Sequence, residues 1–166
     1  MIELMAVRLF IINERVIALN NSHIVLRVMR LDDLNGAIQL WRQTKGVIIR
    51  DYDDSPEGIA RFIHRNPKTT LVLEQDGEIV GTLLCGNDGR RGFLYHFVVR
   101  EDLRNHGLGS MMLNEVYRQL REDGIAKGGL VALQSNESGL RFWQNRGWSR
   151  RNDLFYLDFP LCPGAE

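Results

Sequence analysis

The residues best suited to chemistry form one stretch, in which a β-rich run ending at Val99 is followed by Arg104-x-x-Gly107-x-Gly109. The first N–H groups of a helix lack intrahelical partners and lie at the positive end of the helix dipole. Glycines let an anion approach these groups closely, and Arg104 adds a charged donor. The spacing therefore predicts an anion-binding helix start. A solvated helix start, whose two glycines serve packing, is the alternative.

This stretch does not fit two other nucleotide-binding motifs. No Gly-Lys-Ser or Gly-Lys-Thr follows the glycines, which excludes a P-loop. The spacing is not Gly-x-Gly-x-x-Gly, and the N-terminal half of the chain lacks repeated strand–helix units. A dinucleotide-binding fold is therefore not expected.

A strand, a long helix and a second strand must position the stretch. Because a hairpin cannot enclose such a helix, the two strands are expected to be parallel and joined by a crossover. The preceding strands are expected to be antiparallel, since Asp76-Gly77 is typical of a hairpin turn. We therefore expect an α/β (α+β) fold with a mixed, mostly antiparallel sheet and helices on both faces. The expected strands cover residues 69–74, 78–85, 93–99 and 130–134, and the helix covers residues 104–122.

Further elements flank this unit. Asp32 is expected to cap one helix, and Ser55-Pro56 begins a second helix that Asn66-Pro67 ends. The β-rich residues 7–12 and 15–19 predict a short hairpin or an extra edge strand. The remaining expected elements are a strand at 24–29, a helix at 136–146 and a strand pair at 148–151 and 155–159.

Charge and composition exclude several classes of protein. The chain has 166 residues, which fits one domain, and its 21 basic and 21 acidic side chains give zero net charge. That balance gives no global attraction to nucleic acid or to an anionic membrane, and no apolar run approaches the about 20 residues that cross a bilayer. Cys85 and Cys162 form no disulfide framework, which favours the cytoplasm. The histidines lack metal-ligand spacing, so no metal is expected.

Two motifs at the right separation indicate a family. The chain resembles the GNAT superfamily of N-acetyltransferases over residues 24–159, and within it the YpeA-like group of small bacterial members. The turn Asp88-Gly89-Arg90-Arg91-Gly92 is similar to the glycine-rich turn of that group. We expect an N-terminal extension at 1–22, the acetyltransferase domain at 23–160 and a tail at 161–166. The motif residues are Arg104, Gly107 and Gly109 in the first signature and Asn136, Trp143, Gly147 and Trp148 in the second.

The resemblance implies a site for acetyl-CoA as co-substrate. Backbone groups of Phe97 and Val99 would pair with the pantetheine arm, and the amides of residues 105–110 would cradle the pyrophosphate. Asn136 would bind the pantetheine arm and Trp143 would line the thioester end, although an ordinary helix cap and a core aromatic are the respective alternatives. The implied binding residues are Phe97, Val98, Val99, Arg104, Asn105, His106, Gly107, Leu108, Gly109, Ser110, Asn136 and Trp143.

The resemblance also implies direct attack of an amine on the thioester, which favours a general base. An alkyl amine with a pKa near ~10.4 must lose a proton, at a cost of roughly 4–5 kcal/mol at pH 7. Several relatives carry a glutamate at one of two positions, but this chain has Phe93-Leu94-Tyr95-His96 and Val131 there. His96 is the best candidate base, because imidazole titrates near neutral pH. Glu78, Asp88, a water chain and a structural role for His96 are the alternatives.

Tyr95 is the candidate acid. Many relatives carry a tyrosine that protonates the departing thiolate, but this chain has Trp143, whose indole is not a usable acid. Water or Tyr95 would then supply the proton. By strand alternation, Tyr95 is expected on the face opposite His96.

We therefore expect an N-acetyltransferase acting on a primary amine of a small molecule or peptide. An acyl-CoA-binding regulatory protein and a plain interaction module are the alternatives, and apolar residues of the extension allow a homodimer. Residues 46–54 are expected to help form the acceptor site. Asp51, Asp53 and Asp54 in that loop could attract a cationic amine or serve as solvated residues and caps.

Overall fold

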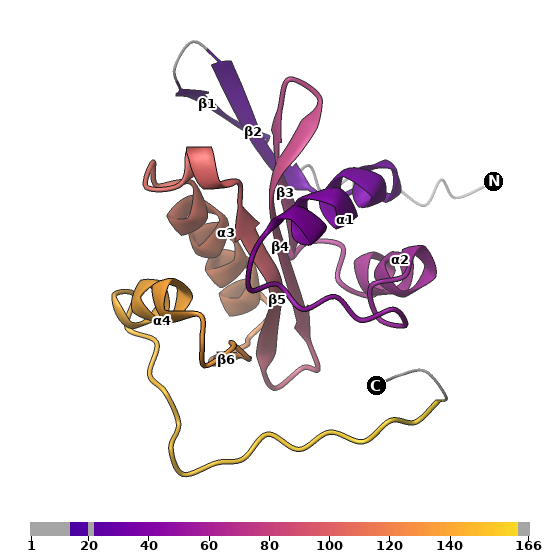
Figure 1. The fold of residues 1–166 in the computed structure, drawn as a ribbon, viewed down its shortest axis with the longest axis vertical. Helices are drawn as coiled ribbons and strands as arrows, with labels where there is room; N and C mark the ends of the chain where they lie inside the picture. The colour runs from indigo at the N-terminus through magenta and orange to yellow at the C-terminus, as the bar shows by residue number, and fades with distance from the viewer. Residues whose placement is uncertain (1–13, 20–21, 163–166) are drawn as a thin grey trace, which may run out of the picture.

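The computed structural model describes residues 14–19 and 22–162. One six-stranded sheet has its strands in the order β1-β2-β3-β4-β5-β6 (Figure 1). Each neighbouring pair is antiparallel except β5 and β6, which are parallel. The predicted mixed, mostly antiparallel sheet is confirmed. The strands are β1 Arg15–Leu19, β2 Ser22–Val28, β3 Thr70–Gln75, β4 Glu78–Asn87, β5 Gly92–Val99 and β6 Gly128–Leu130.

Helices cover both faces of the sheet, as predicted (Figure 1). Side chains of α1 and α2 pack in one apolar cluster, and side chains of α3 and α4 pack in another. The two clusters lie on opposite sides of the strands, so the sheet separates two cores. The helices are α1 Leu34–Gln43, α2 Pro56–Arg65, α3 Leu108–Glu122 and α4 Glu137–Gln144, with short 3-10 turns η1 Leu31–Asp33 and η2 Glu101–Leu103.

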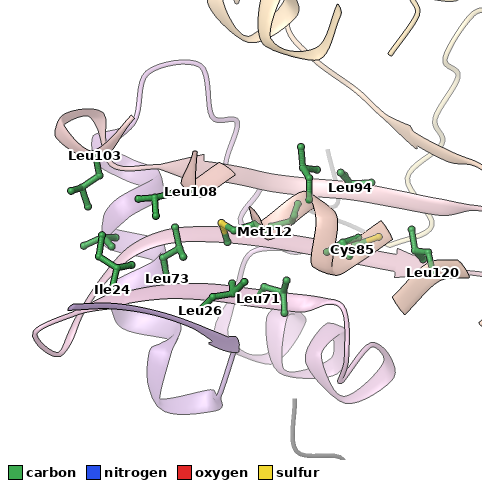
Figure 2. Close-up of a cluster of buried hydrophobic side chains, with 14 of the residues drawn as sticks. Ile24, Leu26, Leu71, Leu73, Cys85, Leu94, Leu103, Leu108, Met112 and Leu120 are labelled. Atoms are coloured by element: carbon green, nitrogen blue, oxygen red, sulfur yellow. The ribbon is translucent and has the colours of Figure 1, made fainter. Parts of the chain in front are cut away.

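The larger core lies under α3. Fully buried side chains from β2, β3 and β4 meet those of α3, and Figure 2 shows them interlocking along the sheet. Burial of this apolar surface is the main driving force that holds the crossover helix on the strands. The labelled members are Ile24, Leu26, Leu71, Leu73, Cys85, Leu94, Leu103, Leu108, Met112 and Leu120.

Local signals set most element ends. Ser55 Oγ accepts the Gly58 N–H at 3.0 Å, which confirms the predicted cap of α2. The predicted cap at Asp32 is wrong. A 3-10 turn precedes α1 there, and Asp33 takes the N-cap position while its carboxylate binds Arg27 at 2.6 Å.

The long helix begins later than predicted. Its first residue is Leu108 rather than Arg104, because Asn105 and Gly107 have φ of 65° and 81°. A right-handed helix cannot include such backbone angles. The Arg104–Gly107 stretch is therefore a loop that leads into the helix.

The chain end differs most from expectation. The predicted strand at 130–134 is replaced by β6, which ends at Leu130, and the predicted strand pair at 148–151 and 155–159 does not form. After α4 the chain runs extended past the bottom of the sheet in Figure 1. The large apolar side chains of residues 154–161 are 61–94% exposed, so packing does not hold this part of the segment on the sheet edge.

The N-terminal strand β1 pairs with β2 and forms one edge of the sheet. The other predicted strand, at residues 7–12, lies outside the described residues. Within the part of the chain that the structure describes, no helix is long and apolar enough to cross a membrane.

Candidate functional site

Strands β5 and β6 pair over only three residues and then separate. Their pairing runs from Gly92 to Leu94 on β5, and β6 ends opposite Leu94. The backbone edge of β5 beyond Leu94 is therefore not used by β6. An extended ligand can add to such an edge in the manner of a strand. Phe97 and Val99, predicted to pair with the pantetheine arm, lie on this edge.

A bulge marks the same place on β5. Between the pairs Thr82–Val98 and Leu84–Tyr95, the single residue Leu83 of β4 faces both His96 and Phe97. His96 has a φ of +42°, which is uncommon for a residue other than glycine. Bulges bend strands and redirect side chains next to active sites.

The bulge changes which way the two candidate catalytic side chains point. His96 stacks on Trp41 of α1, with ring centroids 4.0 Å apart, and Tyr95 meets Phe62 of α2 edge-on at 5.7 Å. Both helices cover the same face of the sheet. The prediction that Tyr95 lies opposite His96 is therefore wrong, because the extra residue breaks strand alternation.

His96 has a carboxylate partner that the sequence did not reveal. Its Nε2 lies 2.6 Å from Asp54 Oδ1, and Asp54 is buried while His96 is largely buried. Asp54 belongs to the loop before α2, and 42 residues separate it from His96. The sequence predicts the same roles for Asp51, Asp53 and Asp54, but Asp51 and Asp53 are exposed.

Tyr95 keeps its proton at neutral pH. Burial raises the pKa of this phenol above its usual value, and the neighbouring Tyr156 and Asp53 add to the rise. A protonated phenol can donate a hydrogen bond or a proton. This state suits the predicted role of Tyr95.

The residues predicted to bind an anion lie at the start of α3. Gly107 is the N-cap, and the first amide bonded back along the helix is Met111 N–H, to Gly107 O at 3.1 Å. The amides of residues 108–110 have no acceptor one turn back in the helix. Arg104 Nε donates to Val99 O at 2.9 Å, which ties this turn to the end of β5.

The two motif glycines meet different demands. A Cβ on Gly107 would have nothing within 4 Å, and its φ of 81° is what favours glycine there. A Cβ on Gly109 would lie 3.0 Å from the Phe97 ring, so this glycine lets the helix approach β5. The turn geometry therefore explains Gly107, and packing against β5 explains Gly109.

The remaining residues of this stretch divide by exposure. Leu108 and Val98 are buried, one in each core, so only their backbone can face a ligand. Arg104, Asn105 and His106 are exposed at the turn. Exposed polar side chains and backbone amides thus gather on one surface at the helix start.

Arg146 joins this surface and was missed in the sequence. Its guanidinium donates to Ser110 Oγ and lies 3.9 Å from the centre of the Phe142 ring. No motif marks Arg146, because it follows α4 and reaches α3 only through packing between the two helices.

Asn136 and Trp143 both have structural roles. Asn136 Oδ1 accepts the Gly139 N–H at 3.0 Å and caps α4. Trp143 lies in an aromatic cluster with Phe97, Phe142 and Trp148, at centroid distances of 5.3, 5.2 and 5.0 Å. The cap uses Oδ1, so the side-chain N–H groups of Asn136 can donate to another partner. Trp143 contacts Phe97, which lies on the free edge of β5.

The alternative bases lie in other surroundings. Glu78 is exposed and pairs with Arg100 at 3.4 Å. Asp88 accepts the backbone N–H groups of Arg91 and Arg90 in the β4–β5 turn, and these bonds hold the pKa of its carboxyl below the usual range.

Among the described residues, no group of three or more His, Cys, Asp or Glu side chains could hold a metal ion.

Comparisons with known proteins agree with this geometry. The model of the acetyltransferase (GNAT) family matches residues 34–148. Acetyltransferase SG1711 of Sodalis glossinidius is 27% identical over 141 residues, which cover 85% of this chain and 98% of that protein.

Solved structures share the fold. An acetyltransferase of Streptococcus agalactiae matches with a TM-score of 0.67 at 14% identity, over 89% of this chain and 95% of that one. The paia N-acetyltransferase of Thermoplasma acidophilum, solved in complex with coenzyme A, matches with a TM-score of 0.65 at 18% identity, over 74% and 87%. The chain therefore belongs to the acetyltransferase (GNAT) family and is an acetyltransferase.

Proposed function

We propose that the chain is an N-acetyltransferase that transfers the acetyl group of acetyl-CoA to a primary amine of a small molecule or peptide by direct attack in a ternary complex. The observation that supports this most is the buried His96–Asp54 pair at the bulge where β5 and β6 separate. The amine nitrogen attacks the thioester carbonyl and forms the C–N bond, and the C–S bond breaks. His96 accepts the amine proton, and the thiolate takes a proton from Tyr95 or water.

The donor site is proposed along β5 and the start of α3. Phe97 and Val99 offer backbone groups to the pantetheine arm, with Val98 between them. The amides of residues 105–110 and the side chains of Arg104 and His106 would bind the pyrophosphate, and Arg146 is added to this set. Asn136 and Trp143 complete the proposed site from the α4 side.

The acceptor is proposed to be cationic before it loses its proton. Asp51 and Asp53 are exposed on the loop before α2, next to the buried Asp54. These two carboxylates, of which Asp53 lies near Tyr95, would attract an ammonium group. Membership of the YpeA-like group is proposed on the glycine-rich turn at residues 88–92.

A regulatory protein that binds acyl-CoA without turnover is the second candidate. Trp143 favours it, because the usual tyrosine acid is missing at that position. Binding calorimetry with acetyl-CoA, followed by thiol release with a panel of spermidine, tyramine and a peptide with a free amino terminus, separates the two. Binding with turnover supports the enzyme, whereas binding without turnover supports the regulator. Absence of binding would contradict the donor site and leave an interaction module.

Three broader assignments accompany this proposal. The domain limits are 1–22 for the extension, 23–160 for the catalytic domain and 161–166 for the tail. A cytoplasmic location is supported by Cys85 and Cys162, which are free thiols. A homodimer is supported by the exposed apolar side chains of residues 154–161.

A further inference from the structure

We propose that Asp54 is a positioning residue that fixes the proton of the neutral His96 ring on Nε2 and so makes Nδ1 the atom that accepts the amine proton. This inference rests on the proposed N-acetyltransferase function. It starts from one contact, the 2.6 Å between His96 Nε2 and Asp54 Oδ1, made by side chains that are only 11% and 6% exposed.

The carboxylate is held in one orientation. Its other oxygen, Oδ2, accepts the Arg50 N–H at 2.8 Å, and the Asp54 N–H donates to Arg50 O at 2.9 Å. The next residue, Ser55, caps α2. The loop therefore presents Oδ1, and only Oδ1, to the ring.

The imidazole is also held in one orientation. Trp41 stacks on it with an interplanar angle of 17°, and the Trp41 indole N–H donates to Thr82 Oγ at 2.8 Å. The same Thr82 hydroxyl donates to the His96 carbonyl oxygen at 2.7 Å. This network fixes both the ring and the backbone at the bulge, and it explains how the positive φ of His96 is maintained.

The tautomer follows from hydrogen-bond chemistry. An ionised carboxylate only accepts hydrogen bonds, so the nitrogen facing Asp54 must carry the proton. A neutral imidazole has one N–H, and the lone pair is therefore on Nδ1. A carboxylate that selects the tautomer of a catalytic histidine in this way is known to matter greatly for rate.

Asp54→Asn tests this directly. The Arg50 N–H still requires an acceptor, so the asparagine oxygen remains on that side and its NH₂ group faces His96. An amide N–H only donates, which moves the ring proton to Nδ1. Nitrogen-15 NMR of the histidine rings in the full chain should show the Nε2–H form in the wild type and the Nδ1–H form in Asp54→Asn. His96→Gln identifies the His96 signals by their loss.

Activity gives an independent readout, taken with the best acceptor of the amine panel. Asp54→Asn should lower kcat by about 10- to 100-fold with an unchanged Kd for acetyl-CoA. In the His96→Gln background the same change should have no further effect, because Asp54 acts through His96. Glu57→Gln, an exposed carboxylate in the first turn of α2, is the matched control and should change neither readout.

The inference would be overturned by an Nδ1–H ring in the wild type, by an unchanged tautomer in Asp54→Asn, or by equal loss of activity from Asp54→Asn in both backgrounds. Wild-type turnover in His96→Gln would also overturn it. Failure of the proposed function is distinguishable, since it appears as absent turnover in the wild type, while the tautomer is read without any acceptor.

Discussion

At the scale of single residues, the motif at the start of α3 combines two physical demands. Gly107 satisfies a backbone angle and Gly109 satisfies a close approach to Phe97. The same residue type is therefore required for different reasons two positions apart. Substitutions can separate the two.

Gly107→Ala and Gly109→Ala should both destabilise the fold, but by different routes. The first places a Cβ in the left-handed region, at about 1–2 kcal/mol. The second forces the Phe97 ring to move, at about 1–3 kcal/mol. Phe97→Leu should relieve only the second cost, as measured by urea denaturation of the single and double variants. Relief of both, or of neither, would contradict this division.

Trp143 is the residue at which this chain departs from many relatives. Trp143→Ala should remove three ring contacts and lower stability by about 3 kcal/mol, the low end for a large aromatic because this side chain is only half-buried. Trp143→Tyr should retain most of these contacts and transfer acetyl at the wild-type rate or faster. Thermal denaturation and thiol release measure the two effects. Activity that appears only in Trp143→Tyr would instead favour the regulatory protein.

At the scale of elements, a buried charge cluster joins β2, β3 and the start of α1. Arg27 binds Asp33 at 2.6 Å and Glu74 at 2.6 Å, and the Arg27 and Asp33 side chains are 7% and 10% exposed. Burial by itself would raise the pKa of Asp33, but hydrogen bonds from Arg27 and from the Arg30 N–H outweigh it and hold the pKa below its usual value. The ionised carboxylate therefore stabilises the folded chain.

Asp33→Asn should lower the free energy of unfolding by about 3 kcal/mol at pH 7, because it leaves part of the buried Arg27 charge uncompensated. A carboxyl with a lowered folded-state pKa contributes stability above its unfolded pKa of about 3.9 and loses it as pH falls through the folded value. The difference between variant and wild type should therefore shrink towards pH 2–3 in urea denaturation. Asp32→Asn, an exposed neighbour, is the control. An equal difference at both pH values would contradict the assignment.

At the scale of the whole molecule, the most prominent feature is the segment that follows α4. Phe155, Leu157, Phe159 and Leu161 all lie in this segment, which forms no strand. They are 80–94% exposed. Apolar surface of this extent on a protein commonly marks an interaction site.

We expect the full chain to self-associate through this segment. Phe155→Glu with Phe159→Glu should shift sedimentation towards the monomer, because charged side chains oppose burial of that surface. Arg150→Glu, which adds charge just before the segment, is the control and should leave association unchanged. A wild-type chain that stays monomeric at high concentration would contradict the homodimer proposal.

Short-range physics made much of this molecule readable from its sequence. Ser55 and Asn136 cap helices because their side chains reach amides three residues away. Asp76 and Gly77 form the hairpin turn with φ of 52° and 83°, as their residue types favour. Such signals predicted the mixed sheet and its crossover, and the resemblance of two motifs, one at Arg104 and one at Asn136, pointed to the family.

Contacts between distant segments were decided only by the tertiary structure. The bulge on β5 inserts one residue, and a shift of one residue reverses which face every following side chain occupies. That shift brings His96 onto Trp41 and Asp54, and helix packing brings Arg146 to Ser110. The sequence pattern defines the elements, because their signals act within one turn or one pair of strands. The partners of His96 and Ser110 depend on how those elements pack, which no local spacing encodes.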